Sequence, residues 1–151
     1  MIVRKGITSF FQHRTIPEFS FGEFKDIVRS CVAPIGFTIH SLTERGVTPN
    51  FHTAALERFN DQFTILAHST YPIIAFAEPL KPGICELRFR DANSIAKRIT
   101  DSYPNVTIAS TKELLRRIDI SDIEQLNRAE REQIKYWKPQ TIGELAFNWW
   151  D

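Results

Sequence analysis

The C-terminal stretch Tyr136–Asp151 constrains the fold of this chain more than any other segment. It contains all three tryptophans of the protein, together with Tyr136 and Phe147. Each such ring buries on the order of 150–250 Å² when it packs against protein, so the stretch is not expected to stay solvated. We predict either a closing helix that packs into the core or a surface that contacts a partner. The stretch contains no catalytic motif.

The length and composition are those of an ordinary globular protein. A chain of 151 residues with 42% hydrophobic and 25% charged residues can bury a core and is unlike a disordered segment. We therefore expect one domain over residues 1–151. The 19 basic and 18 acidic residues give a net charge of +1, which provides no overall attraction to nucleic acid or to a membrane surface. Because no apolar run has the length of a signal peptide or a membrane span, the cytoplasm is the expected location.

Helix-start patterns occur at four places. Ser20-Phe-Gly-Glu23 fits a capping box, and the apolar residues behind it recur at spacings of three and four, which predicts a helix closed by Pro34 and Gly36. The same S/T-x-x-E pattern precedes three later apolar-periodic segments: Ser110–Glu113, Ser121–Glu124 and Thr141–Glu144. The apolar side of the second of these segments continues to Trp137. A further helix is expected after Asp91, which is its predicted cap.

Short β-branched and aromatic runs predict strands between and around these helices. The runs are Ile2–Phe11, Phe37–Leu42, Thr53–Phe59, Gln62–His68, Tyr71–Ala77, Ile84–Arg90 and Asn105–Ala109. Asn60-Asp61 is the predicted tight turn of a β-hairpin, because both residue types tolerate left-handed backbone conformations. The resulting prediction is an α+β fold in which a mainly antiparallel sheet of about five to seven strands forms a layer pair with helices on at least one face.

The histidines are the first candidates for a catalytic or metal site. None of the four has a metal-ligand spacing. His40 and His68 fall on predicted strands and could meet across the sheet, with Glu44 or Glu57 as an orienting carboxylate. A small enzyme or ligand-binding domain with its site near His40, His52 and His68 is therefore the main alternative to a binding protein; His13 lies outside this group.

The cysteines and glycines give no sign of catalysis. Cys31 and Cys85 lie among apolar residues and are predicted to be buried, reduced thiols. Cys31 beside a histidine would imitate a thiol nucleophile, but its place on an apolar helix stripe disfavours a thiolate. The scattered glycines form no nucleotide-binding or acyl-transfer motif. We predict a protein that is not an enzyme and that has no catalytic residue, no metal and no cofactor.

Basic residues suggest a second alternative, an RNA-associated protein. Arg88, Arg90, Lys97 and Arg98 lie beside aromatic residues, and Arg116-Arg117 adds a second basic pair. Such a pattern suits single-stranded nucleic acid. The near-zero net charge disfavours it, because dedicated nucleic-acid-binding domains usually carry a basic excess.

Acidic residues gather late in the chain, close to the tryptophans. They are Asp119, Asp122, Glu124, Glu130, Glu132, Glu144 and Asp151. If these carboxylates share a face with Trp149 or Trp150, they form the charged and aromatic surface typical of a protein interface. Neighbours on a helix point about 100° apart, so both tryptophans are buried only if that helix is covered on two sides. We expect one of them to be available to a partner.

The ending of the chain resembles the close of small bacterial proteins of unassigned chemistry. The residues concerned are Lys138-Pro139, Ile142-Gly143-Glu144, Phe147-Asn148 and Trp150-Asp151. In length, expected fold and lack of an enzyme motif, the chain is similar in kind to immunity proteins of bacterial toxin systems. The resemblance implies a protein that binds a cognate toxin domain, often a nuclease, and covers its active site. The near-neutral charge differs from that of strongly acidic nuclease inhibitors.

Overall fold

The computed structural model describes residues 2–11 and 17–151. Its centre is a sheet of six strands in the order β1-β2-β3-β4-β5, with β6 paired to β4. The strands are β1 (Thr38–Thr43), β2 (Phe51–Arg58), β3 (Asp61–His68), β4 (Ile73–Ala77), β5 (Phe89–Arg90) and β6 (Thr107–Ile108). Every pairing is antiparallel except that of β6 with β4. The predicted α+β class with a mainly antiparallel sheet is confirmed.

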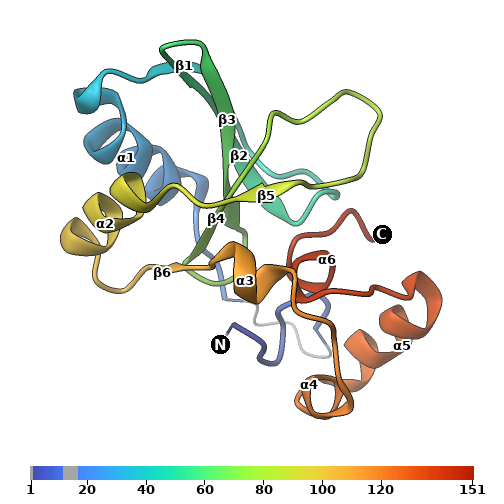
Figure 1. Ribbon diagram of the computed structural model, residues 1–151. Coiled ribbons are helices and arrows are strands. Elements are labelled where there is room, and N and C mark those ends of the chain that lie inside the picture. Colours follow the sequence, from blue (N-terminus) through green and yellow to red (C-terminus); the bar gives the residue numbers. More distant parts are fainter. Residues whose placement is uncertain (1, 12–16) are drawn as a thin grey trace.

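The first face of the sheet is covered by two helices. These are α1 (Phe21–Cys31) and α2 (Asn93–Ser102), with the short 3-10 helix η1 (Ala33–Ile35) after α1, and Figure 1 shows both α-helices on the same side of the strands. The predicted capping box of Ser20 and Glu23 is present at the start of α1. Phe24, Ile27 and Val28 of this helix pack against alternate residues of β2 and β3 in the first core. Burial of this apolar stripe therefore positions the helix.

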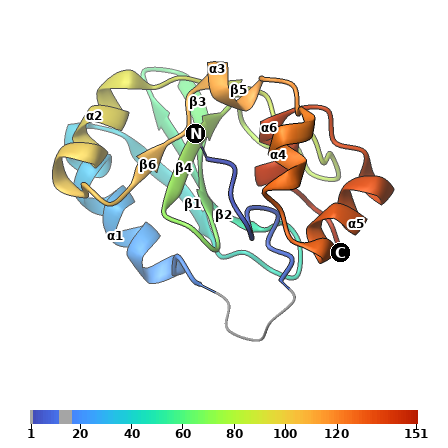
Figure 2. The same cartoon turned by 90° about the horizontal axis from the view of Figure 1, so that it is seen from below.

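The second face carries the C-terminal part of the chain and the N-terminal segment. Its elements are α3 (Thr111–Leu114), α4 (Ile120–Glu124), α5 (Arg128–Trp137) and α6 (Ile142–Ala146). Figure 2 shows α4, α5 and α6 on the side of the sheet opposite α1 and α2. All five residues of β4 are buried, because Ile74 and Phe76 enter the first core while Ile73, Ala75 and Ala77 enter the second. The described helices thus lie on both faces, and none of them is long and apolar enough to cross a membrane.

The β2–β3 hairpin turns one residue earlier than predicted. Phe59 and Asn60 form the turn, with φ angles of 52° and 65°, and Asp61 already belongs to β3 opposite Arg58. Two consecutive left-handed residues are the mark of a primed turn, which matches the right-handed twist of the paired strands. The prediction of Asn60-Asp61 as the turn was wrong because Phe59, an unfavourable residue for φ > 0, occupies the first turn position.

The predicted strand over Ile2–Phe11 is wrong. This segment forms turns, and its backbone amides are bound by a side chain instead of a neighbouring strand. The Glu130 carboxylate of α5 accepts hydrogen bonds from the Gly6 amide (2.7 Å) and from the Thr8 amide and hydroxyl (3.1 and 2.7 Å). Sequence periodicity cannot show a partner of this kind, because it comes from more than a hundred residues away.

Two predictions between β4 and α3 also need correction. The expected strand Ile84–Arg90 is reduced to β5, and residues 78–88 form a mostly exposed β4–β5 loop. Asp91 does not cap α2, whose N-cap is Ala92 without a side-chain hydrogen bond. The Asp91 carboxylate instead accepts hydrogen bonds from the Thr111 amide and hydroxyl, at 2.9 and 3.0 Å.

The predicted caps of the later helices are partly confirmed. Ser110 and Thr141 accept the expected backbone hydrogen bonds at the starts of α3 and α6. The Ser121–Glu124 pattern is wrong, because Asp119 is the cap of α4 and forms its capping box with Asp122. The apolar segment that continued to Trp137 is divided in two, since Asn127 caps a separate α5.

The closing helix is shorter than predicted. It ends at Ala146, and residues 147–151, the C-terminal segment, have no helical structure. Two buried asparagines fix this segment to the start of β2. The Asn148 amide donates to Asn50 Oδ1 at 2.8 Å, the Asn50 amide donates to the Asn148 carbonyl at 3.0 Å, and Asn50 Nδ2 donates to the Ala146 carbonyl at 2.9 Å.

Candidate binding cleft

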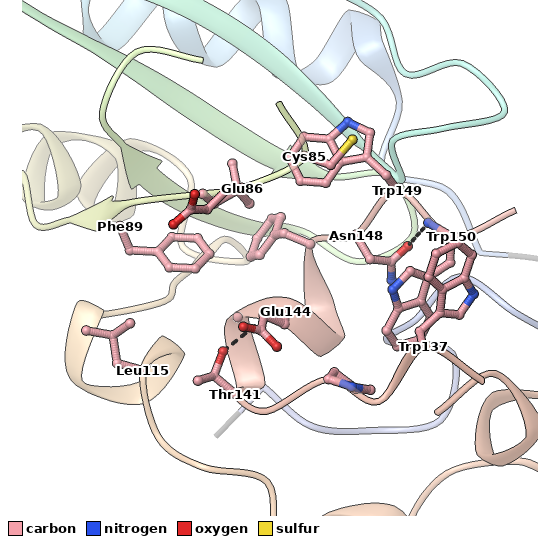
Figure 3. Close-up of a pocket in the computed structure, with 14 residues that line it drawn as sticks. Cys85, Glu86, Phe89, Leu115, Trp137, Thr141, Glu144, Asn148, Trp149 and Trp150 are labelled. Carbon is pink, nitrogen blue, oxygen red and sulfur yellow. Dashed lines mark hydrogen bonds between the residues drawn. The ribbon is translucent and has the colours of Figure 1, made fainter. Parts of the chain in front are cut away.

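The C-terminal segment and the β4–β5 loop enclose a cleft of about 460 Å³. Figure 3 shows its aromatic walls, with Trp149 beside Cys85 and with Trp137 and Trp150 grouped on the other side of Asn148. The apolar lining residues are Leu87, Phe89, Leu115, Trp137, Pro139, Phe147, Trp149 and Trp150. Leu115 is 56% exposed and Trp137 is 38% exposed. The cleft is therefore open to solvent and lined largely by aromatic rings.

The two tryptophans of the C-terminal segment pack on different elements. Trp149 packs edge-on against Phe51 of β2, with ring centroids 5.2 Å apart. Trp150 lies parallel to Trp137 of α5, with centroids 6.3 Å apart and an interplanar angle of 1°. Both Trp149 and Trp150 are half-buried. Each ring therefore packs on a different element, and both rings line the cleft.

The charged groups of the cleft are two carboxylates, Glu86 from the β4–β5 loop and Glu144 from α6. Both side chains are exposed. Glu144 is held in place: its amide donates to Thr141 Oγ1 at 3.2 Å, and its carboxylate accepts from the Gln140 amide at 2.6 Å. Among the described residues, no lysine, arginine or histidine lines this cleft. The cleft is thus acidic as well as aromatic.

Two further cavities, here called the groove, adjoin the cleft and are lined by the β4–β5 loop and by the strands of the sheet. A cavity of about 230 Å³ shares Cys85 and Trp149 with the cleft. A further cavity of about 800 Å³ shares Thr43, Thr53 and Lys81 with the second one. The floor of the groove is formed by small residues of β1 and β2: Ser41, Thr43, Thr53 and Ala55. Each cavity therefore shares lining residues with the next, so the three lie next to one another.

Two of the predicted partner-binding carboxylates are buried and bonded inside the protein. Asp122 is 1% exposed and accepts two hydrogen bonds from Arg116, at 2.8 and 2.9 Å. Glu130 is 0% exposed and binds the N-terminal segment. Neither side chain reaches the surface, so the prediction that they contact a partner is corrected. Their sequence pattern did not reveal this because their bonding partners are brought near only by the fold.

The other predicted carboxylates are exposed but are not gathered around the tryptophans. Asp119 caps α4, and hydrogen bonds from the Ser121 hydroxyl and the Asp122 amide lower its pKa below the usual range. Glu124 lies at the end of α4, and Glu132 forms an ion pair with Arg128 within α5 at 3.2 Å. Of the late acidic residues, only Glu144 lines the cleft with Trp149 and Trp150.

The three described histidines of the alternative site do not converge. His40 Nε2 donates to the Glu57 carboxylate at 2.9 Å on the exposed edge of the sheet. His52 packs with Phe21 and Phe24 on the first face, while His68 packs with Phe147 and Tyr71 on the second. Each of the two buried rings is fully bonded by backbone groups. His13 lies outside the described residues.

The cysteines differ in environment. Cys31 is buried in α1, as predicted, and Cys85 is exposed on the β4–β5 loop and lines the cleft, contrary to prediction. Sequence reasoning missed Cys85, Glu86, Phe89 and Leu115 as residues that line the same cleft as the tryptophans. The turn-rich run after the buried strand β4 was the only sequence sign of this loop, and it gave no indication of what the loop covers.

Most of the basic residues proposed for RNA binding are bonded to other groups. Arg90 forms two hydrogen bonds with Asp61, at 2.9 and 3.0 Å, and these bonds lower the pKa of Asp61. Lys97 pairs with Asp101 at 2.8 Å, and Arg98 donates to the Cys31 carbonyl at 2.9 Å. These residues therefore do not form one continuous basic stripe.

In the part of the chain that the structure describes, no three histidine, cysteine or acidic side chains are grouped so that they could hold a metal ion. Comparison with protein-family models, with curated proteins and with solved structures finds no match to this chain.

Proposed function

We propose that this protein binds another protein, and that the aromatic cleft is the centre of the contact surface. The observation that carries the proposal is the convergence of Trp137, Trp149 and Trp150 on one open cleft. Tryptophan is enriched among the residues that dominate binding free energy at protein interfaces, and such residues sit in pockets near the interface centre. Exposed aromatic surface of this kind mostly marks a binding site.

The specific form that we propose is neutralisation of a bacterial toxin domain in the cytoplasm. This step rests on the resemblance of the chain to immunity proteins, whose role is to cover the active site of a cognate toxin. The acidic rim of the cleft, with Glu86 and Glu144, supports the same proposal, because charge complementarity to a basic toxin surface would orient the two proteins.

Growth rescue combined with capture tests this function. The product of the neighbouring gene is expressed alone and together with the tagged protein, and bound partner is quantified. We expect toxicity alone, rescue on co-expression, and a one-to-one complex. Trp150→Ala and Trp137→Ala should each weaken binding by roughly 30-fold or more, the loss expected at an interface hot spot.

The control for these variants is Phe59→Ala. Phe59 is 91% exposed at the tip of the β2–β3 hairpin, so its removal should leave capture unchanged. Thermal unfolding of each variant separates a lost contact from a lost fold. Wild-type affinity in both tryptophan variants, or a collapse of their stability that matches the loss of binding, would contradict the proposal.

A further inference from the structure

The chemistry of the cleft restricts what can occupy it. Its walls present tryptophan and phenylalanine rings, and its charged lining groups are Glu86 and Glu144. Neither carboxylate forms an ion pair within the described residues. Electron-rich ring faces and carboxylates both attract cations. An anionic or neutral apolar occupant would leave the two carboxylates without a counter-charge.

We propose that the cleft receives an arginine side chain from an extended segment of the partner protein. A guanidinium group is planar, so it stacks on an aromatic face while its N–H donors reach a carboxylate, and a lysine ammonium cannot do both with the same geometry. The rings of Trp137 and Trp150 and the carboxylate of Glu144 lie in the same cleft. Glu86 of the β4–β5 loop lines the same cleft and is a second carboxylate acceptor.

The groove argues for a chain-like occupant. The cleft adjoins cavities of about 230 and 800 Å³ that are lined by the β4–β5 loop and the sheet. Free arginine or another small cation would fill only the cleft. A peptide segment that places one arginine among the tryptophans can continue along the groove floor, where Ser41, Thr43 and Thr53 offer hydroxyl groups. The groove therefore has room for a peptide segment, and the adjoining cleft has room for its arginine side chain.

This inference rests on the proposed function, and it is tested without the natural partner. The indole N–H signals of the three tryptophans are followed by NMR while the peptide Ac-Ala-Ala-Arg-Ala-Ala-NH2 is added to the labelled protein. We expect saturable shifts of the Trp137 and Trp150 signals. The same peptide with citrulline in place of arginine is almost identical in shape but uncharged, and it should bind at least tenfold more weakly.

Substitutions in the protein supply the matched control. Glu86→Gln and Glu144→Gln keep the size of the side chain and remove its charge. Each should weaken binding of the arginine peptide about threefold or more. Glu132→Gln removes an exposed carboxylate of α5 that is not in the cleft and should leave binding unchanged. Glu144→Gln retains an oxygen that can accept from the Gln140 amide, so α6 should stay folded.

The outcomes separate the two proposals. Equal binding of the arginine and citrulline peptides, or shifts confined to residues outside the cleft, would overturn the arginine inference. If free arginine binds as tightly as the peptide, the claim that the occupant is an extended segment is overturned. If toxin rescue depends on Trp150 while the arginine peptide fails to bind, the inference fails and the proposed function stands. If the peptide binds as expected but no neighbouring product is neutralised, the proposed function fails.

Discussion

Buried polar side chains hold the second face of the sheet together at the scale of single residues. His68 is 0% exposed. Its Nε2 contacts the Ile7 carbonyl at 2.6 Å, and its Nδ1 accepts hydrogen bonds from the Thr70 and Tyr71 amides at 3.0 and 3.2 Å. This arrangement requires a neutral ring protonated on Nε2, because Nδ1 already faces two N–H donors. Burial lowers the pKa of His68 to about 4, and burial lowers that of His52 as well.

The two histidines predict a loss of stability in weak acid. An unfolded histidine takes up a proton near pH 6.5, whereas folded His68 does so only near pH 4. The unfolded state therefore binds more protons within this window, and the unfolding free energy falls as pH is lowered from 6.5 to 4. We expect a loss on the order of 3 kcal/mol from His68. Urea unfolding at several pH values measures it.

The variant His68→Gln separates this effect from that of the carboxylates. It should be less stable than the wild type at pH 7, since the backbone hydrogen bonds are lost in part, yet its stability should change less between pH 6.5 and 4. Asp61 and Asp119 have lowered pKa values, so their contributions are lost only at more acidic pH. Equal pH dependence in wild type and variant would show that His68 is not the responsible group.

At the scale of elements, the cleft depends on a close approach between α6 and β5. Gly143 is buried in α6, and a β-carbon at this position would overlap the Phe89 ring and lie 3.0 Å from the Leu114 carbonyl. The absence of a side chain thus allows α6 to contact both β5 and α3. Phe89 and Gly143 also line the cleft, so the same contact shapes the proposed binding site.

Gly143→Ala is expected to destabilise the protein by about 1–3 kcal/mol, the usual cost of overpacking a filled site. Gly22→Ala is the matched control, because a β-carbon there meets nothing closer than the Ser20 hydroxyl at 3.8 Å. Replacing a helical glycine in open space should stabilise the protein by up to about 1 kcal/mol. Thermal unfolding of both variants measures the difference. If Gly143→Ala left the stability unchanged, Phe89 would be able to move aside without a cost in free energy.

At the scale of the whole molecule, two cores share one sheet. Alternate residues of β2, β3 and β4 enter the core beneath α1 and α2 or the core beneath α3 and α6. All three tryptophans belong to the second side, where Trp149 and Trp150 pack against the core and Trp137 contacts Trp150. Loss of either core removes half of the packing of the same strands. The two cores should therefore unfold together.

This cooperativity is tested by comparing the unfolding transitions that two spectroscopic probes report. Tryptophan fluorescence reports the second side alone, whereas far-ultraviolet circular dichroism reports helices on both faces. We expect both signals to change in one denaturant transition with the same midpoint. Separate midpoints, with fluorescence changing first, would mean that the second core and its cleft open while α1 and α2 remain packed on the sheet.

The sequence by itself determined the elements whose signals are local. The capping box before Phe21, the two runs on either side of the hairpin turn that became β2 and β3, and the apolar run of β4 each specify an element through neighbouring residues. These predicted the α+β class and the antiparallel hairpin. The aromatic C-terminal stretch likewise predicted partial burial of its tryptophans, because rings of that size cannot remain solvated together.

Only the tertiary structure decided which distant groups meet. Glu130 and Asp122 looked like surface carboxylates until the fold placed them against Thr8 and Arg116. The β4–β5 loop brought Glu86 into the same cleft as the tryptophans, although no periodicity in the sequence links the two segments. Periodic patterns report which side of an element is buried, but long-range hydrogen bonds and clefts depend on the relative placement of elements. That placement is fixed by packing of the two cores around the shared sheet.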